Sequence, residues 1–294
     1  MKNLFFIILI FLLFFGCTQT PLEIKAPIEF EEFSIIVLPD TQNYSKSHPE
    51  IFYSQTDWII QNKEELNIKF IIHEGDLVNN ANQEEQWIVA NKAMNKLDGV
   101  VPYSVIRGNH DRHELYQKYF GKERFKDYDW YLAGDEFNKN NISKLEINDF
   151  NFLFISLDVC PDTNELNFIK ENITGEQFDF AIVTTHGYLN ENAERNVHVC
   201  NNTEYIWDFA KEIKNVRLML SGHVHDESMR TDPNDFNQSV VQMLADHKTR
   251  ENGGNGYLRI LIFTDINTIN VTTYSPTLNE FETDKDSEFL IELN

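Results

Sequence analysis

The sequence predicts a mixed α/β fold around a buried sheet, because apolar strand-like runs alternate with helical segments through its first half. Its second half contains many short apolar runs separated by turns, which is typical of strand-rich structure. The chain has 294 residues and is 41% hydrophobic, enough for a sizeable core and against general disorder. No linker interrupts the sequence after residue 32, so one domain is expected over residues 33–294.

The elements of the first half follow one another in a strand–helix alternation. Residues 33–38 form a continuous apolar, β-branched run that predicts a buried strand. A helix, a strand, a helix and a strand are then expected at residues 49–66, 68–72, 83–97 and 103–106.

The second half begins with a predicted hairpin. Residues 144–147 and 152–157 flank an Asn148–Asp149 pair that is typical of a tight turn. The remaining elements are strands expected at residues 180–184, 217–220, 240–244, 257–263 and 269–273, and helices at residues 165–171 and 203–213.

Residues 1–16 predict a signal peptide. Lys2 precedes an apolar run over residues 4–15, which is too short to span ~30 Å of hydrocarbon as a helix. Gly16 and Cys17 at the end of this run resemble the lipobox of prokaryotic lipoproteins, although the two phenylalanines before Gly16 depart from its usual residues.

The lipobox resemblance implies a lipid on Cys17 and a polar tether over residues 17–32. We therefore expect an exported lipoprotein at the cell surface or in the periplasm, in contact with the membrane only through its anchor. Plain secretion or an uncleaved anchor is the alternative. Cys160 and Cys200 remain as a pair that an oxidising compartment can join, with two free thiols as the alternative.

The charge of the chain restricts its partners. Its 25 Lys and Arg residues against 47 Asp and Glu residues give a formal net charge of -22. Because nucleic-acid phosphates are held by basic surfaces, a nucleic-acid polymer is not expected as a partner. A small anion remains compatible with the sequence, since a bound cation overrides the field of the whole protein locally.

Polar residues follow five of the expected strands where each strand ends, the place at which α/β sheets form their ligand sites. These segments are Pro-Asp-Thr-Gln at 39–42, Glu-Gly-Asp at 74–76, Gly-Asn-His-Asp at 108–111, a His at 186 and Gly-His-Val-His at 222–225. Carboxylates, carboxamides and imidazoles in this mixture suit Mn, Fe, Zn or Mg.

The order of these motifs resembles the calcineurin-like metallophosphoesterase family. The resemblance covers residues 33–225. The Asp-Thr-Gln first motif and the Gly-rich segment at 253–257 are similar to those of an exported branch of the family. It implies a four-layer α-β-β-α sandwich of two mixed sheets, with a dinuclear metal site at the strand ends.

The family pattern, carried onto this sequence, implies two metal sites that share Asp76. The ligands of the first site are then Asp40, Gln42, Asp76 and His225, and those of the second are Asp76, Asn109, His186 and His223. Two divalent metal ions (Mn, Fe, Zn or Mg) would provide a bridging hydroxide that attacks a small phosphate mono- or diester. Most members have His in place of Gln42, so the first site is expected to bind metal more weakly or to prefer Mn or Mg.

Two residues of the third motif are catalytic candidates. His110 resembles an outer histidine of the family, which stabilises the transition state or protonates the leaving oxygen. Asp111 either orients that imidazole or caps a helix. The alternative function is a non-catalytic metal-binding lipoprotein that uses the fold as a recognition surface, a reading that the presence of Asp76 and His110 disfavours. Specificity is expected from loops at residues 43–49, 188–200 and 226–237.

Overall fold

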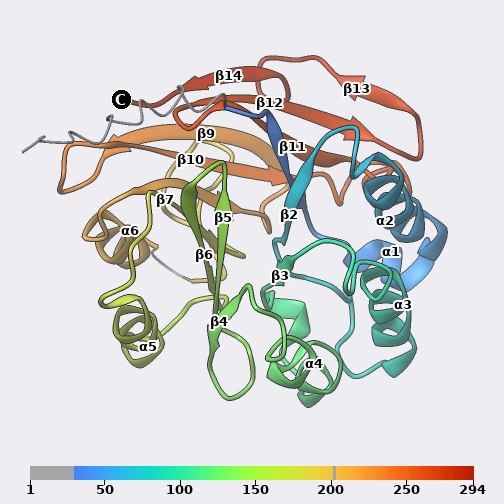
Figure 1. The fold of residues 1–294 in the computed structure, drawn as a ribbon. Helices are drawn as coiled ribbons and strands as arrows, with labels where there is room; N and C mark the ends of the chain where they lie inside the picture. The colour runs from blue at the N-terminus through green and yellow to red at the C-terminus, as the bar shows by residue number, and fades with distance from the viewer. Residues whose placement is uncertain (1–29, 201–202) are drawn as a thin grey trace, which may run out of the picture.

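The computed structural model describes residues 30–200 and 203–294, so the expected signal peptide and Cys17 lie outside the described residues. Within these ranges, two seven-stranded sheets pack face to face and helices cover both outer faces (Figure 1). The predicted four-layer α-β-β-α sandwich with two mixed sheets is confirmed.

The first sheet has the order β13-β12-β11-β1-β2-β3, with β14 paired to β12. Its strands are β1 (Phe33–Leu38), β2 (Ile68–His73), β3 (Tyr103–Val105), β11 (Leu258–Asp265), β12 (Thr268–Ser275), β13 (Glu280–Glu282) and β14 (Phe289–Glu292). β1, β2 and β3 run parallel, so their carboxyl ends meet at one edge.

The second sheet has the order β4-β5-β6-β7-β8-β10-β9. Its strands are β4 (Tyr131–Gly134), β5 (Asn141–Ile147), β6 (Phe150–Leu157), β7 (Phe180–Thr185), β8 (Val216–Ser221), β9 (Asp226–Pro233) and β10 (Ser239–Asp246). β6, β7, β8 and β10 are parallel, which brings a second set of strand ends together.

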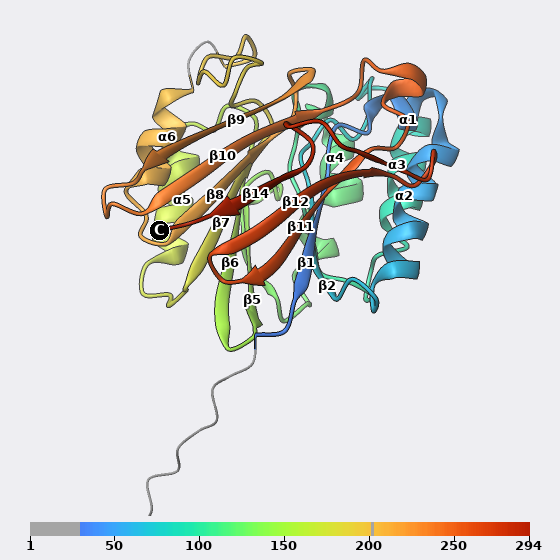
Figure 2. The same cartoon turned by 90° about the horizontal axis from the view of Figure 1, so that it is seen from above.

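The helices divide between the two outer faces, as the view from above shows (Figure 2). Those packed on the first sheet are α1 (Gln42–Ser47), α2 (Pro49–Asn62), α3 (Glu84–Met94) and α4 (Glu114–Phe120), and those on the second are α5 (Thr163–Ile173) and α6 (Glu204–Lys211). Short 3-10 turns occur at η1 (Asn109–Asp111), η2 (Lys122–Arg124) and η3 (Glu251–Gly253).

Aromatic rings fill the space between the sheets. The ring of Phe70 on β2 stacks on Phe154 of β6 with centroids 3.7 Å apart, and Phe33 stacks on Phe263 at 4.7 Å. Phe152 meets both Phe33 and Phe263 edge-on. Burying such side chains stabilises the fold by about 1.5–3 kcal/mol each, which holds the two sheets in fixed relative positions.

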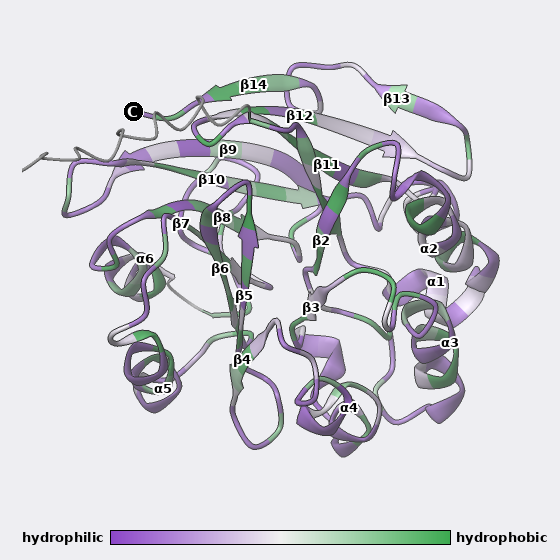
Figure 3. Ribbon diagram, viewed as in Figure 1, coloured by the Kyte–Doolittle hydropathy of each residue, from purple (hydrophilic) through white to green (hydrophobic). Residues whose placement is uncertain are grey.

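Residues 226–237 differ from the sequence-based expectation of a loop. Residues 226–233 form β9, which pairs with β10 from Asp226 opposite Asp246 to Pro233 opposite Ser239. β9 lies at the sheet edge and is mostly polar, in contrast to the apolar strand β6 (Figure 3). An edge strand needs no apolar alternation, so its sequence carries little strand signal.

Cys160 and Cys200 form a disulfide across a sequence separation of 40 residues. It joins the segment after β6 to the segment between β7 and α6. Among the described residues, no helix is both long enough and apolar enough to cross a membrane.

Candidate metal centre

The ends of β1, β2, β7 and β8, together with the turn after β3, bring the sequence-predicted ligands to one edge of the sandwich. Asp40 follows β1, Asp76 follows β2, and Asn109 begins η1 after β3. His186 follows β7 directly, and His223 follows β8 by two residues.

The predicted second ligand set converges on one point. His186 Nε2 lies 3.3 Å from Asp76 Oδ1, 3.1 Å from Asn109 Oδ1 and 3.2 Å from His223 Nδ1. Ligand atoms of Asp76, His186 and His223 all lie within 4.8 Å of one another. Two imidazole nitrogens that face each other beside a carboxylate and an amide oxygen form the donor set of a transition-metal site.

Hydrogen bonds orient this set for a cation. His186 Nδ1 lies 2.8 Å from the carbonyl oxygen of Glu74, so Nδ1 carries the proton and Nε2 is left as the ligand atom. Asp76 Oδ2 is buried and has no hydrogen-bond partner among the described residues. A divalent cation would satisfy both groups, and the residues present therefore fit a metal ion.

The electrostatics of the centre favour positive charge. Burial disfavours a charged His186, but the Asp76 and Asp40 carboxylates outweigh this effect and raise its pKa to about 10. The His186 ring in turn holds the pKa of Asp76 below its usual range, against the effect of burial. Burial and the neighbouring His186 lower the pKa of His223 to about 3, which keeps that ring neutral and able to ligate.

The predicted first ligand set is less well organised. Gln42 is buried and its Oε1 has no hydrogen-bond partner among the described residues, whereas His225 is exposed. Asp40 Oδ1 accepts the His223 N–H at 3.2 Å, and Asp40 Oδ2 lies 2.6 Å from Lys248 Nζ. The sequence motifs do not reveal Lys248, which follows β10 by two residues.

His110 lies beside the second ligand set. Its backbone N–H donates to Asp76 Oδ1 at 2.9 Å, and its ring Nδ1 lies 2.7 Å from the carbonyl oxygen of Asn79. That carbonyl fixes the proton on Nδ1 and leaves Nε2 for chemistry. His110 lines a cavity of about 310 Å³ together with Asp76, His223, Val224, His225 and Lys248.

Of the two roles expected for Asp111, its contacts fit the cap at η1 and not the orientation of the His110 imidazole. The Asp111 carboxylate accepts N–H bonds from Leu77 at 3.1 Å, Val78 at 3.1 Å and Gly108 at 2.9 Å. Burial and the Asp76 charge raise the pKa of Asp111 to about 7. Asp111 therefore ties the backbone after Asp76 to the start of η1, while the Asn79 carbonyl positions the histidine.

The backbone is strained at two of the predicted ligand residues. Asp76 has a φ of 49° and His223 a φ of 70°, a left-handed conformation that costs a non-glycine residue of order 1–3 kcal/mol. Gly108 is needed for close approach, since a Cβ there would lie 2.0 Å from Asp76 Oδ1. Strain that the fold maintains at ligands is typical of a functional site.

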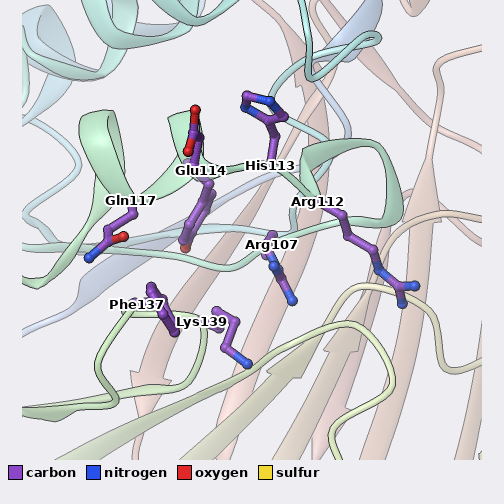
Figure 4. A pocket seen from close by; sticks show the side chains of 8 residues that line it. Arg107, Arg112, His113, Glu114, Gln117, Phe137 and Lys139 are labelled. Atoms are coloured by element: carbon purple, nitrogen blue, oxygen red, sulfur yellow. The ribbon is translucent and has the colours of Figure 1, made fainter.

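A second cavity of about 330 Å³ lies beside the same motif and is rich in cationic side chains (Figure 4). Arg107, Arg112 and Lys139 line it, and Arg112 directly follows Asp111. The Arg107 guanidinium is paired with Asp158, with Nε and Oδ1 2.9 Å apart. The cavity therefore contains cationic side chains, although the chain as a whole is strongly acidic.

A family model described as calcineurin-like phosphoesterase matches residues 33–227, which include every proposed ligand. The chain belongs to this family. Members are metal-dependent hydrolases of phosphoric esters, and the family resemblance seen in the motifs is confirmed. The exported branch, the individual ligand assignments and the identity of the metal remain predictions.

Known proteins similar to the chain include one curated relative and several solved structures. An uncharacterised protein, YvnB, of Bacillus subtilis (strain 168) is 30% identical over 277 residues, which are 88% of this chain. The chain spans about a fifth of that relative's length (21%).

Two solved structures share the fold. The purple acid phosphatase PPD1 of yellow lupin (Lupinus luteus) has a TM-score of 0.56 at 14% identity, covering 91% of this chain and 55% of its own. A dimetal phosphatase from Danio rerio has a TM-score of 0.57 at 11% identity, covering 88% and 98%.

Proposed function

We propose that the chain hydrolyses a small phosphate mono- or diester at the centre formed by Asp76, Asn109, His186 and His223. The observation that carries this proposal is the convergence of their ligand atoms next to a cavity that Asp76, His110 and His223 line. When bound, divalent metal supplies Lewis-acid activation of water and neutralises charge on the phosphoryl oxygens.

The protein side chains divide the remaining work. The carboxylate of Asp76 and the two imidazoles hold the cation, and the Glu74 carbonyl holds His186 in the ligating tautomer. As the water oxygen bonds to phosphorus it releases a proton to the solvent, and as the bond to the leaving oxygen breaks His110 Nε2 donates a proton to that oxygen. The Asn79 carbonyl keeps the ring in place for this transfer.

The size and charge of the neighbouring cavities support a small anionic substrate. The two cavities have volumes of about 310 and 330 Å³. These volumes are near the lower limit for pockets that bind small molecules. Arg112 in the second cavity offers positive charge to another anionic group of the substrate, whereas Lys139 there is paired with Glu165. The charge of -22 opposes the approach of a long nucleic acid.

The proposed location is the outer face of a membrane, through a lipid on Cys17. The signal-like residues 1–16 and the Gly16–Cys17 pair support it. Cys17→Ser should then move the protein from the membrane to the soluble fraction, and mass spectrometry should find a lipid only on the unmutated chain. An unmodified Cys17 in the native protein contradicts the anchor and leaves secretion.

The test of activity is a panel of phosphate mono- and diesters with the full chain in detergent. The protein is stripped of metal and reloaded with Mn²⁺, Zn²⁺, Mg²⁺ or Fe²⁺. We expect hydrolysis only after the protein is reloaded with metal, and we expect one class of ester to be preferred. Turnover that persists in the stripped protein contradicts the metal mechanism.

A further inference from the structure

Lys248 lies buried within the predicted first ligand set. Its Nζ is 2.6 Å from Asp40 Oδ2 and 2.6 Å from Asp246 Oδ2, and it also donates to the carbonyl oxygen of His223. Its side chain is 9% exposed, while those of Asp40 and Asp246 are 0% exposed. Lys248 thus donates hydrogen bonds to Asp40 Oδ2 and to the His223 carbonyl oxygen, and it forms an ion pair with Asp246.

The contacts of Lys248 leave little of the first set for a metal ion. Both oxygens of Asp40 are engaged, one by Lys248 and the other by the His223 N–H. Apart from the shared Asp76, the remaining members are Gln42, whose buried Oε1 has no partner among the described residues but is neutral, and His225, which is exposed. A divalent cation at Asp40 would stand beside a buried ammonium and be repelled by it.

The second ligand set shows the opposite arrangement. Asp76 Oδ2 is buried and has no hydrogen-bond partner among the described residues, and His186 Nε2 faces His223 Nδ1 at 3.2 Å. Asp76 Oδ2 is therefore left for a metal ion to bind, whereas both oxygens of Asp40 already have partners.

We propose that the ammonium of Lys248 replaces the first metal, so that the chain tightly binds one divalent cation, at Asp76, Asn109, His186 and His223. This inference rests on the proposed function and changes its metal requirement. Lys248 balances the charge of Asp40 and Asp246, and it lines the cavity in which the ester binds. It is a positioning residue for Asp40, and through the Asp40–His223 bond it helps to hold a ligand of the single metal.

The test measures metal content rather than turnover. The full chain in detergent is loaded with excess Mn²⁺ or Zn²⁺, dialysed against metal-free buffer and analysed by inductively coupled plasma mass spectrometry. The unmutated protein should retain one equivalent. Lys248→Gln removes the ammonium and frees Asp40 and Asp246, so it should retain a second equivalent, whereas Lys248→Arg keeps the charge and should retain one.

Lys144→Gln is the matched control. Lys144 lies on β5, outside both ligand sets, and its Nζ forms an ion pair with Glu176 at 2.8 Å. It should retain one equivalent. Two tightly held equivalents in the unmutated protein overturn the inference, as does a single equivalent in a folded Lys248→Gln. Loss of all metal from the unmutated protein contradicts the proposed function instead. If Lys248→Gln does not fold, the unmutated protein and Lys248→Arg still decide the outcome.

Discussion

Replacing Gly108 by Ala tests whether the backbone at η1 must touch Asp76. Gly108 has an extended backbone, with φ −85° and ψ 179°, that alanine adopts freely, so any effect comes from the added methyl group. That Cβ would lie 2.0 Å from Asp76 Oδ1 and 2.3 Å from the Asp76 backbone nitrogen. Ordinary contact begins at 3.4 Å, so the two segments must separate by more than about 1 Å.

The expected size of the effect follows from this displacement. Overpacking at a buried position costs about 1–3 kcal/mol of unfolding free energy. A shift of about 1 Å at a catalytic group costs roughly 100-fold in rate. Because Asp76 is the proposed ligand that moves, Gly108→Ala should also bind metal more weakly than the unmutated protein.

The assay combines chemical denaturation, metal content and kcat on an activated aryl phosphate. Gly99→Ala is the control: its φ of +71° strains alanine by about 1–2 kcal/mol, but a Cβ there has nothing within 4 Å. It should lose stability and keep its kcat. A Gly108→Ala enzyme with unchanged kcat and metal content would refute the close approach and, with it, the placement of Asp76.

Three further predictions address the proton donor, the disulfide and pH. His110→Ala should keep its metal and lose roughly 100-fold in kcat, more for an alkoxide than for an aryl leaving group; loss of metal would make His110 a ligand. Replacing Cys160 and Cys200 by Ser should lower the unfolding free energy by about 4 kcal/mol, as denaturation reports, because it opens a loop of 40 residues; unchanged stability would contradict the pairing. Burial and nearby Arg250 lower the pKa of His247 from 6.5 to about 3, so the unfolded chain binds a proton that the folded one does not. The contribution of His247 to stability should thus be fully present above pH 6.5 and fall by roughly 1.4 kcal/mol per pH unit between pH 6.5 and about 3, so His247→Phe should remove this part of the slope in urea titrations at several pH values.

The sequence predicts the alternation of strands and helices and the places of the polar motifs, and its resemblance to the family implies the four layers of the fold. The first strand was predicted at residues 33–38 and spans Phe33–Leu38. Its apolar run and the turn residues after it are adjacent in the chain, so local patterns suffice to predict both. Parallel strands then bring Asp40, Asp76 and Asn109 to one edge, which follows from topology without side-chain detail.

Only the tertiary structure decided how these ligands are charged and oriented. Lys248 contacts Asp40, which is 208 residues away in the sequence, and the Asn79 carbonyl contacts the ring of His110, which is 31 residues away. Asp111 accepts hydrogen bonds from three backbone amides, whereas its place in the motif left an imidazole contact and a helix cap both open. Such contacts depend on how distant segments pack, and a backbone carbonyl is the same in every residue. The order of motifs therefore predicts a metal centre, while the packing around it decides which carboxylates are left for a metal ion.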